Sequence, residues 1–257
     1  PLMQKHLMSK PRKPAKRPVS RAQSTNPLLS RWATPFELPP FAKIEAKHFR
    51  PALETAFREH RAEISKISAN SAKPSFANTI VALEKCGRLL ARAGAVFSNL
   101  EATDSTPELQ EIAREMSPRF AAHETQIYFD TKLFRRIDDL FQRRDKLKLN
   151  AEELRVLERH HLSFVRAGAR LSAAAKSRVK EINARLASLV TQFMQNVLKD
   201  EQSWHLLLDG ENELNGLPGT MRGAAARAAA DLGHEGKHAI TLARSSVEGF
   251  LTYSSRR

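Results

Sequence analysis

The sequence predicts a mainly α-helical protein, an antiparallel array of helices with one very long helix and a small β-containing segment at the C-terminal end. Three observations predict this fold class. Apolar residues recur at steps of three and four over most of positions 51–199, which is the helical period. Only 10 Gly and 7% aromatic residues are present, which suits helices better than sheets. The stretches between the periodic segments are short, and short connections place neighbouring helices antiparallel.

The first stretch, residues 1–25, is predicted to be a disordered basic tail. Residues 1–31 hold eight Lys or Arg and no acid, so more than half of the net charge of +14 lies there. A segment rich in Pro, Lys and Ser has no means of burying itself. Weak binding to a polyanion such as nucleic acid is the alternative use of this charge, although the tail has no aromatic residue for stacking on bases.

Residues 26–200 are predicted to form a helical lobe. Its first part stays extended because five prolines lie between Pro27 and Pro51. The second helix begins near a cap at Asn78, and Pro118 is expected to bend or split the third. The four helices that precede the long one are expected, in order, at 51–71, 75–102, 108–129 and 131–144.

The longest predicted element is one helix from Ala151 to Lys199, because this stretch contains no Pro and a single Gly. Asn150 and Glu153 have the spacing of a capping box at its start. Its apolar positions form one continuous stripe, which we expect to be buried against neighbouring helices. At 1.5 Å per residue, such a helix spans roughly 70 Å.

Residues 201–257 are predicted to form a small α+β segment. The apolar runs at 203–208 and 238–243 have the character of short strands. An alanine-rich helix from Pro218 to Gly233 lies between them, and 249–255 is a candidate third strand. Because no further element follows to cover these strands, we expect the segment to be incomplete at its C-terminal end.

Several phrases of the sequence resemble the thimet oligopeptidase family, and within it the oligopeptidase A and peptidyl-dipeptidase type. They are NPLLSRWATPFELPPFAKIEAKHFRPAL (26–53), PSFANTIVALEKCGRLLARAGAVFSNL (74–100), RAGARL (166–171), FMQNVLKDE (193–201) and ELNGLPG (213–219). The resemblance implies a mostly helical zinc metallopeptidase whose two lobes face a deep channel that admits only short peptides. It also implies that residues 26–257 form much of one lobe, the non-catalytic channel wall.

The resemblance places the family's zinc site downstream, on a helix with the pattern His-Glu-x-x-His and with a further Glu ligand. This chain is expected to be truncated before that region, so no catalytic residue of the family is carried over to it. Zinc, short peptides and the missing catalytic lobe are therefore the cofactor and partners expected for the full-length enzyme. Endopeptidase and dipeptide-releasing activities both stay open.

One alternative is a self-sufficient zinc metalloprotease, because the sequence contains a literal His-Glu-x-x-His at His234, Glu235 and His238. In such a motif the two histidines share a helical face and hold zinc, while the glutamate acts as general base. Gly233 and Gly236 oppose a helix here, and Gly233 suits the end of the preceding helix. By the resemblance, this spot corresponds to a turn between a helix and a strand, and we expect no metal site.

The remaining candidate residues have structural interpretations. Cys86 is expected to be a small buried residue, and a single Cys excludes an internal disulfide framework. His161 falls on the buried stripe and is expected to be a core histidine, whereas its neighbour His160 points about 100° away. The pair Asp138-Asp139 is expected on a solvated helix face.

No stretch has the ~20 apolar residues that a membrane span needs, so we expect no membrane and a cytoplasmic location. Three hypotheses about function follow from the sequence. The first is the non-catalytic lobe of a zinc-dependent oligopeptidase, and the second is the small metalloprotease. The third is a basic helical interaction or nucleic-acid-binding module, for which only the charge argues.

Overall fold

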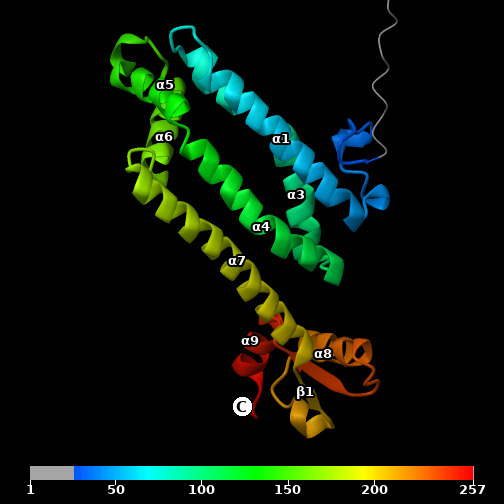
Figure 1. Cartoon of the computed structure of the whole chain (residues 1–257). Coiled ribbons are helices and arrows are strands. Elements are labelled where there is room, and N and C mark those ends of the chain that lie inside the picture. Colours follow the sequence, from blue (N-terminus) through cyan, green and yellow to red (C-terminus); the bar gives the residue numbers. More distant parts are fainter. Residues whose placement is uncertain (1–25, 257) are drawn as a thin grey trace, which may run out of the picture.

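The computed structural model describes residues 26–256, so the tail expected at 1–25 lies outside the described residues. This part of the chain is mainly helical, with one two-stranded antiparallel sheet near its C-terminal end, and the predicted fold class is confirmed (Figure 1). A layer of long helices fills one end of the molecule, and a smaller α+β unit lies at the far end of α7. Short turns of 3-10 helix occur at Pro35–Glu37, Phe41–Lys43, Ala46–His48, Arg144–Lys146 and Glu211–Leu214.

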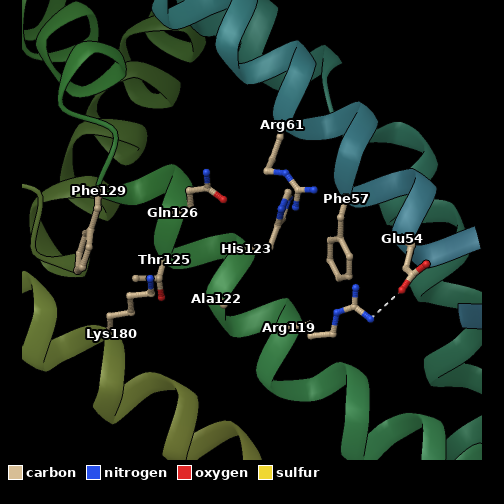
Figure 2. Close-up of a pocket in the computed structure, with 10 residues that line it drawn as sticks. All are labelled: Glu54, Phe57, Arg61, Arg119, Ala122, His123, Thr125, Gln126, Phe129 and Lys180. Atoms are coloured by element: carbon tan, nitrogen blue, oxygen red, sulfur yellow. Dashed lines mark hydrogen bonds and ion pairs between the residues drawn. The ribbon is translucent and has the colours of Figure 1, made fainter. Parts of the chain in front are cut away.

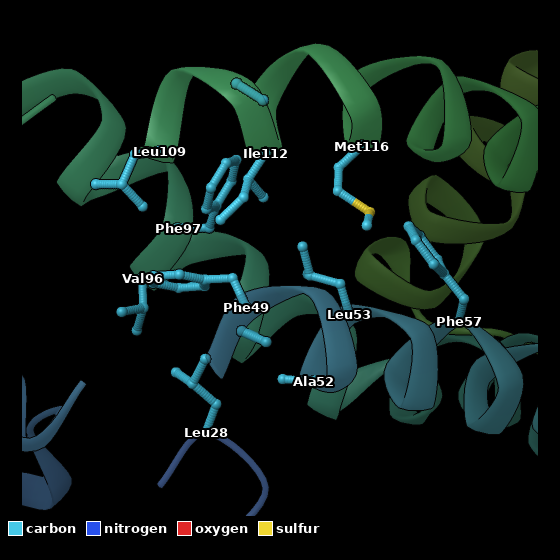
Figure 3. Close-up of a cluster of buried hydrophobic side chains, with 12 residues drawn as sticks. Leu28, Phe49, Ala52, Leu53, Phe57, Val96, Phe97, Leu109, Ile112 and Met116 are labelled. Atoms are coloured by element: carbon cyan, nitrogen blue, oxygen red, sulfur yellow. The ribbon is translucent and has the colours of Figure 1, made fainter. Parts of the chain in front are cut away.

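The first hydrophobic cluster lies between α1 (Phe49–Ser68), α3 (Arg88–Thr103) and α4 (Pro107–Tyr128). Phe49 and Phe97 meet edge to face, with ring centroids 5.1 Å apart. α4 continues through Pro118, so the split expected there does not occur. The buried members of the cluster are Leu28, Phe49, Ala52, Leu53, Phe57, Ala93, Val96, Phe97, Leu109, Ile112, Ala113 and Met116 (Figure 3).

A second cluster joins the end of α1 to α5 (Thr131–Gln142) and α6 (Ala151–Ala167). A single wide turn of π-helix at Phe76–Val81, followed by α2 (Ala82–Lys85), also packs there. The capping box that the sequence predicts at the start of α6 is confirmed, since the side chains of Asn150 and Glu153 each accept the other residue's backbone N–H. The buried residues of this cluster are Ile64, Ile67, Ile80, Leu133, Ile137, Leu140, Leu157, Phe164 and Ala169.

The prediction of one helix over 75–102 is wrong. The chain breaks at Gly87, whose backbone is left-handed with a φ of +70°. Its N–H donates to Oε2 of Glu63 at 2.7 Å, and a Cβ on Gly87 would lie 2.9 Å from the His60 ring. A close approach to α1 therefore replaces the helical hydrogen bonds at this point.

The single helix expected from Ala151 to Lys199 is also wrong. α6 ends at Gly168, which caps it in a left-handed conformation with a φ of +102°. A new helix, α7 (Ala173–Ser203), begins after Ser172, whose Oγ accepts the N–H of Ala175. Gly168 is the single Gly of this stretch, and it forms a C-terminal cap because a left-handed residue without a Cβ costs little there.

The continuous buried stripe expected on this helix holds for α6 but not for α7. α6 buries Leu157, His161 and Phe164, whereas none of the residues of α7 is buried. α7 runs back along α4 in the opposite direction (Figure 1), and four hydrogen bonds that involve side chains join the two helices. Seven apolar side chains of α7, here called the α7 stripe, are between 36% and 65% exposed: Ile182, Leu186, Leu189, Val190, Phe193, Met194 and Val197.

The C-terminal unit follows α7, which crosses the expected boundary at residue 200. Strands β1 (His205–Leu208) and β2 (His238–Thr241) pair antiparallel, with His205 opposite Thr241. α8 (Gly219–Asp231) connects them, as predicted. The third strand expected at 249–255 is wrong, because most of this stretch belongs to α9 (Arg244–Tyr253), where Ser246 Oγ accepts the N–H of Thr241. The buried residues of this unit that form one cluster are Leu208, Leu214, Leu217, Ala225, Ile240 and Phe250.

The division of the chain into 26–200 and 201–257 stays a prediction. Within residues 26–256, no helix is both long and apolar enough to cross a membrane.

Candidate functional site

The literal His-Glu-x-x-His lies on a turn, as the sequence predicts. α8 ends at Asp231, Gly233 follows with a φ of +81°, and Gly236 has a φ of +82°. His234 lies in the turn, and His238 is the first residue of β2.

The two histidines of this motif point to different places. The ring of His234 lies 5.6 Å from the ring of His205. In the ladder, His205 pairs with Thr241 while His238 pairs with Leu208, so His205 and His238 lie at opposite ends, about 10 Å apart along the strand. Over residues 26–256, no three His, Cys, Asp or Glu side chains are grouped so that they could hold a metal ion. These residues therefore do not fit the zinc site of a helical His-Glu-x-x-His motif.

A concave site lies elsewhere, between α1, α4 and α7, and we call it the cationic groove. Its volume is about 630 Å³, which is within the range of ordinary ligand sites. α4 supplies most of the wall, and Lys180 closes the side formed by α7 (Figure 2). The lining residues are Glu54, Phe57, Arg61, Arg119, Ala122, His123, Thr125, Gln126, Phe129 and Lys180.

The charged groups of the groove are unequally paired. Arg119 donates to Oε1 of Glu54 at 3.0 Å and also lies 3.5 Å from a carboxylate oxygen of Glu115. Arg61 and Lys180 form no hydrogen bond or ion pair with any residue that the structure describes. Three cations face one carboxylate, which leaves the lining with a formal charge of +2.

A chain of three polar side chains connects the groove to the break after α2. His123 lines the groove and is only 6% exposed. Its Nε2 lies 3.0 Å from Nδ1 of His60, whose Nε2 lies 3.4 Å from Sγ of Cys86. The Cys86 thiol donates to the carbonyl of Leu83 at 2.9 Å.

The hydrogen bond from the Cys86 thiol to Leu83 favours one tautomer for each histidine. Because the thiol proton goes to Leu83, Sγ accepts from Nε2–H of His60, and Nδ1 of His60 is then an acceptor. Nε2 of His123 must donate to that acceptor, so Nδ1 of His123 carries a lone pair. This Nδ1 is buried and has no hydrogen-bond partner.

Burial favours the neutral form of all three groups of the chain. It lowers the pKa of His123 to about 4, with further lowering by the nearby charges of His60 and Arg61. Burial also lowers the pKa of His60, although Glu63 opposes this. The pKa of the Cys86 thiol is raised to about 11, mainly by burial. Cys86 is therefore an inert thiol, because the thiolate is the reactive form.

The comparisons with known proteins find similar sequences among peptidases. No protein-family model matches the chain. The dipeptidyl carboxypeptidase of Salmonella typhimurium is 37% identical over 228 residues, which cover 89% of this chain and 34% of that protein. The dipeptidyl carboxypeptidase of Escherichia coli is 36% identical over 226 residues, with 88% and 33% covered. Oligopeptidase A of Escherichia coli is 30% identical over 229 residues, with 89% and 33% covered.

The chain is homologous to the thimet oligopeptidase family. This confirms the resemblance that the sequence phrases indicate. The chain spans about a third of the length of the curated relatives it matches. The activity, substrates and partners of a whole enzyme of this family are therefore matters for proposal.

The other histidine that the sequence singles out has a structural role in this homologue, as predicted. His161 is 7% exposed and stacks on Phe141 with ring centroids 3.8 Å apart. Its Nε2 lies 2.9 Å from Oδ1 of Asp138, which Arg170 also approaches at 3.3 Å. Burial alone would raise the pKa of Asp138, but the hydrogen bonds from His161 and Arg170 outweigh burial and lower it. Asp138 is thus less solvated than expected, because it ties α5 to α6.

The cationic groove is the site that sequence reasoning misses. Its residues come from helices far apart in the chain, and none of them belongs to a motif. The only local signal is that His60 and His123 each lie on the apolar face of a helix. Neither histidine stands out there, because a lone histidine on such a face is usually a packed core residue.

Proposed function

We propose that this chain forms a non-catalytic lobe, the channel wall, of a zinc-dependent oligopeptidase that hydrolyses short peptides. The homology to dipeptidyl carboxypeptidases and oligopeptidases A over about a third of their length supports the family and the reaction class. The residues of the His-Glu-x-x-His turn do not fit a metal site, which speaks against the self-sufficient metalloprotease. The cytoplasm is the location we propose for the enzyme.

The α7 stripe is the observation that carries this proposal. Seven apolar side chains on one helix are each at least 36% exposed, and exposed apolar residues gathered on one element mark an interaction surface. Phe193 is 65% exposed and Val190 59%, although both are residues that prefer burial. The catalytic two thirds of such an enzyme would cover this face, and the lobe would then contribute shape rather than chemistry.

A complementation experiment tests this proposal. The chain is combined with the part of the Salmonella typhimurium relative that it does not match, and hydrolysis of a quenched short peptide is followed. We expect the two pieces to associate and zinc-dependent hydrolysis to appear, whereas this chain alone is inactive. Leu186→Asp with Phe193→Asp should abolish association, because each change places a charge on the α7 stripe.

Ser188→Asp is the matched control, since Ser188 is exposed on α7 about 200° around the helix from Leu186. It should associate like the unmodified chain. Association that both variants retain equally would show that the α7 stripe is not the contact.

A further inference from the structure

We propose that the cationic groove binds a short peptide by its C-terminal residue, with the free carboxylate on Arg61. The choice of a peptide among carboxylate ligands rests on the proposed function. The site itself is assigned from its charge, its walls and its one unsatisfied polar atom.

The charge of the groove selects an anion. Arg119 is already neutralised by Glu54, so it contributes little net attraction. Arg61 and Lys180 line the same concavity from α1 and α7 without partners among the described residues. A guanidinium binds a carboxylate through two parallel hydrogen bonds, which makes Arg61 the natural anchor. Lys180 adds a second positive charge on the opposite wall (Figure 2).

The floor of the groove favours a ligand that has a hydrogen-bond donor next to its anionic group. Nδ1 of His123 carries a lone pair that no group of the protein satisfies. The charge of Arg61 is near enough to lower the pKa of His123, and both side chains line the groove, so an anion held by Arg61 brings its neighbouring atoms toward this floor. An unmade hydrogen bond at a buried polar atom is costly, and a ligand N–H would remove that cost once a shift of the ring opens Nδ1, which is buried in the structure, to the groove.

The aromatic walls of the groove favour a ligand that carries an apolar side chain. Phe57 and Phe129 line the groove, and Phe57 packs against His123 with ring centroids 4.9 Å apart. The C-terminal residue of a peptide carries a carboxylate, an amide N–H and a side chain on one Cα atom. Inorganic phosphate lacks the N–H and the apolar group, and a simple fatty acid lacks the N–H. A cavity of about 630 Å³ is large enough for a dipeptide.

Direct binding to the full chain tests this inference by isothermal titration. The probes are N-acetyl-alanyl-phenylalanine, its C-terminal amide, and 3-phenylpropionate, which has the carboxylate and ring but no N–H. We expect the free acid to bind at least about tenfold more tightly than the amide, since a hydrogen bond to a charged group has that effect. The acid should also exceed 3-phenylpropionate, and its binding should weaken as salt is added.

Arg61→Gln and Lys180→Gln test the two cations separately. Both side chains are exposed and unpaired, so neither change should alter the melting temperature. Arg61→Gln should abolish the preference for the acid over the amide, and Lys180→Gln should reduce it. Arg58→Gln is the matched control, because Arg58 is exposed on the same helix but does not line the groove.

Equal binding of acid and amide, no binding of the acid, or an unchanged preference in Arg61→Gln would overturn the inference. Binding of 3-phenylpropionate as tight as that of the peptide would overturn the peptide assignment. None of these outcomes bears on the complementation experiment. Failure of complementation alone would overturn the proposed function and leave a carboxylate site in place.

Discussion

Helices α1 and α7 both border α4, and they are held in opposite ways. α1 buries seven residues, including Phe49, Leu53 and Phe57, and meets α4 through the first hydrophobic cluster. α7 buries none and meets α4 through polar groups. Ser117 Oγ donates to the carbonyl of Ala187 at 3.1 Å, and Gln195 Nε2 donates to the carbonyl of Gln110 at 2.8 Å.

This difference teaches that the apolar residues of α7 are not there to hold the described helices together. The side of α7 toward α4 is fastened by hydrogen bonds, while the side chains of the α7 stripe stay between 36% and 65% exposed. We expect this combination on a helix that lies between two parts of a larger protein, with one side bonded to α4 and the apolar side covered by the other part. The predictions that follow test how far the two helices differ.

The largest expected effect comes from truncating one leucine on each helix. Leu53→Ala empties a fully buried site on α1 and should lower the free energy of unfolding by about 2–5 kcal/mol. Leu186→Ala on α7, where the side chain is 53% exposed, should lower it by less than about 1 kcal/mol. Urea denaturation of both variants measures the difference. Equal losses would mean that the α7 stripe is packed.

The next effect concerns the joint between α6 and α7. Gly168→Ala places a Cβ 2.7 Å from Leu171 on a backbone with a φ of +102°, and should cost about 1–3 kcal/mol of stability. Gly223→Ala is the control, because Gly223 lies inside α8 with no atom within 4 Å of an added Cβ. That change should be neutral or stabilising by up to about 1 kcal/mol. A thermal melt of each variant distinguishes them, and an unperturbed Gly168→Ala would argue for a continuous helix.

A pH effect is expected where His123 of α4 meets His60 of α1. The folded-state pKa of His123 is lowered to about 4, below the usual 6.5. The folded state therefore binds fewer protons than the unfolded state between these values, and stability rises with pH in this window. The contribution is complete above about pH 6.5 and is lost as the pH falls through 4.

His123→Gln should flatten this part of the stability–pH curve. His205→Gln, a change in β1, serves as the control that keeps the wild-type shape. Urea denaturation between pH 4 and 7.5 measures both curves. Parallel curves for His123→Gln and the unmodified chain would contradict the buried neutral histidine.

The smallest effect on folding is expected from Phe193→Ser on α7. The side chain is 65% exposed, so the free energy of unfolding should change by no more than about 0.5 kcal/mol. Self-association should nevertheless fall, because exposed apolar surface drives it. Sedimentation velocity at several concentrations measures this. Lower stability together with unchanged association would reverse the interpretation of α7.

Much of the fold could be predicted from local sequence. The helical class, the capping box of Asn150 and Glu153, the core position of His161 and the turn at Gly233 all depend on neighbours within a few residues. Features of this kind can be predicted because all the residues that determine them are close together in the sequence.

The errors have a common physical origin. Gly87 and Gly168 each cost only about 1 kcal/mol inside a helix, so sequence alone does not tell whether a helix tolerates them. The surrounding structure decides, through Glu63 in one case and through the turn to α7 in the other. The periodic apolar pattern of α7 likewise predicts a covered face but not what covers it. The cationic groove depends on three helices meeting, which no local pattern encodes.

The measurement that tests the central claim most directly is zinc content beside peptide hydrolysis for the purified chain alone. Elemental mass spectrometry after dialysis is compared between the unmodified chain and His234→Ala, with a quenched short peptide as substrate. A non-catalytic lobe predicts no stoichiometric zinc and no hydrolysis in either protein. About one zinc per chain, with hydrolysis that a chelator stops and His234→Ala abolishes, would contradict this account and make the chain an enzyme in its own right.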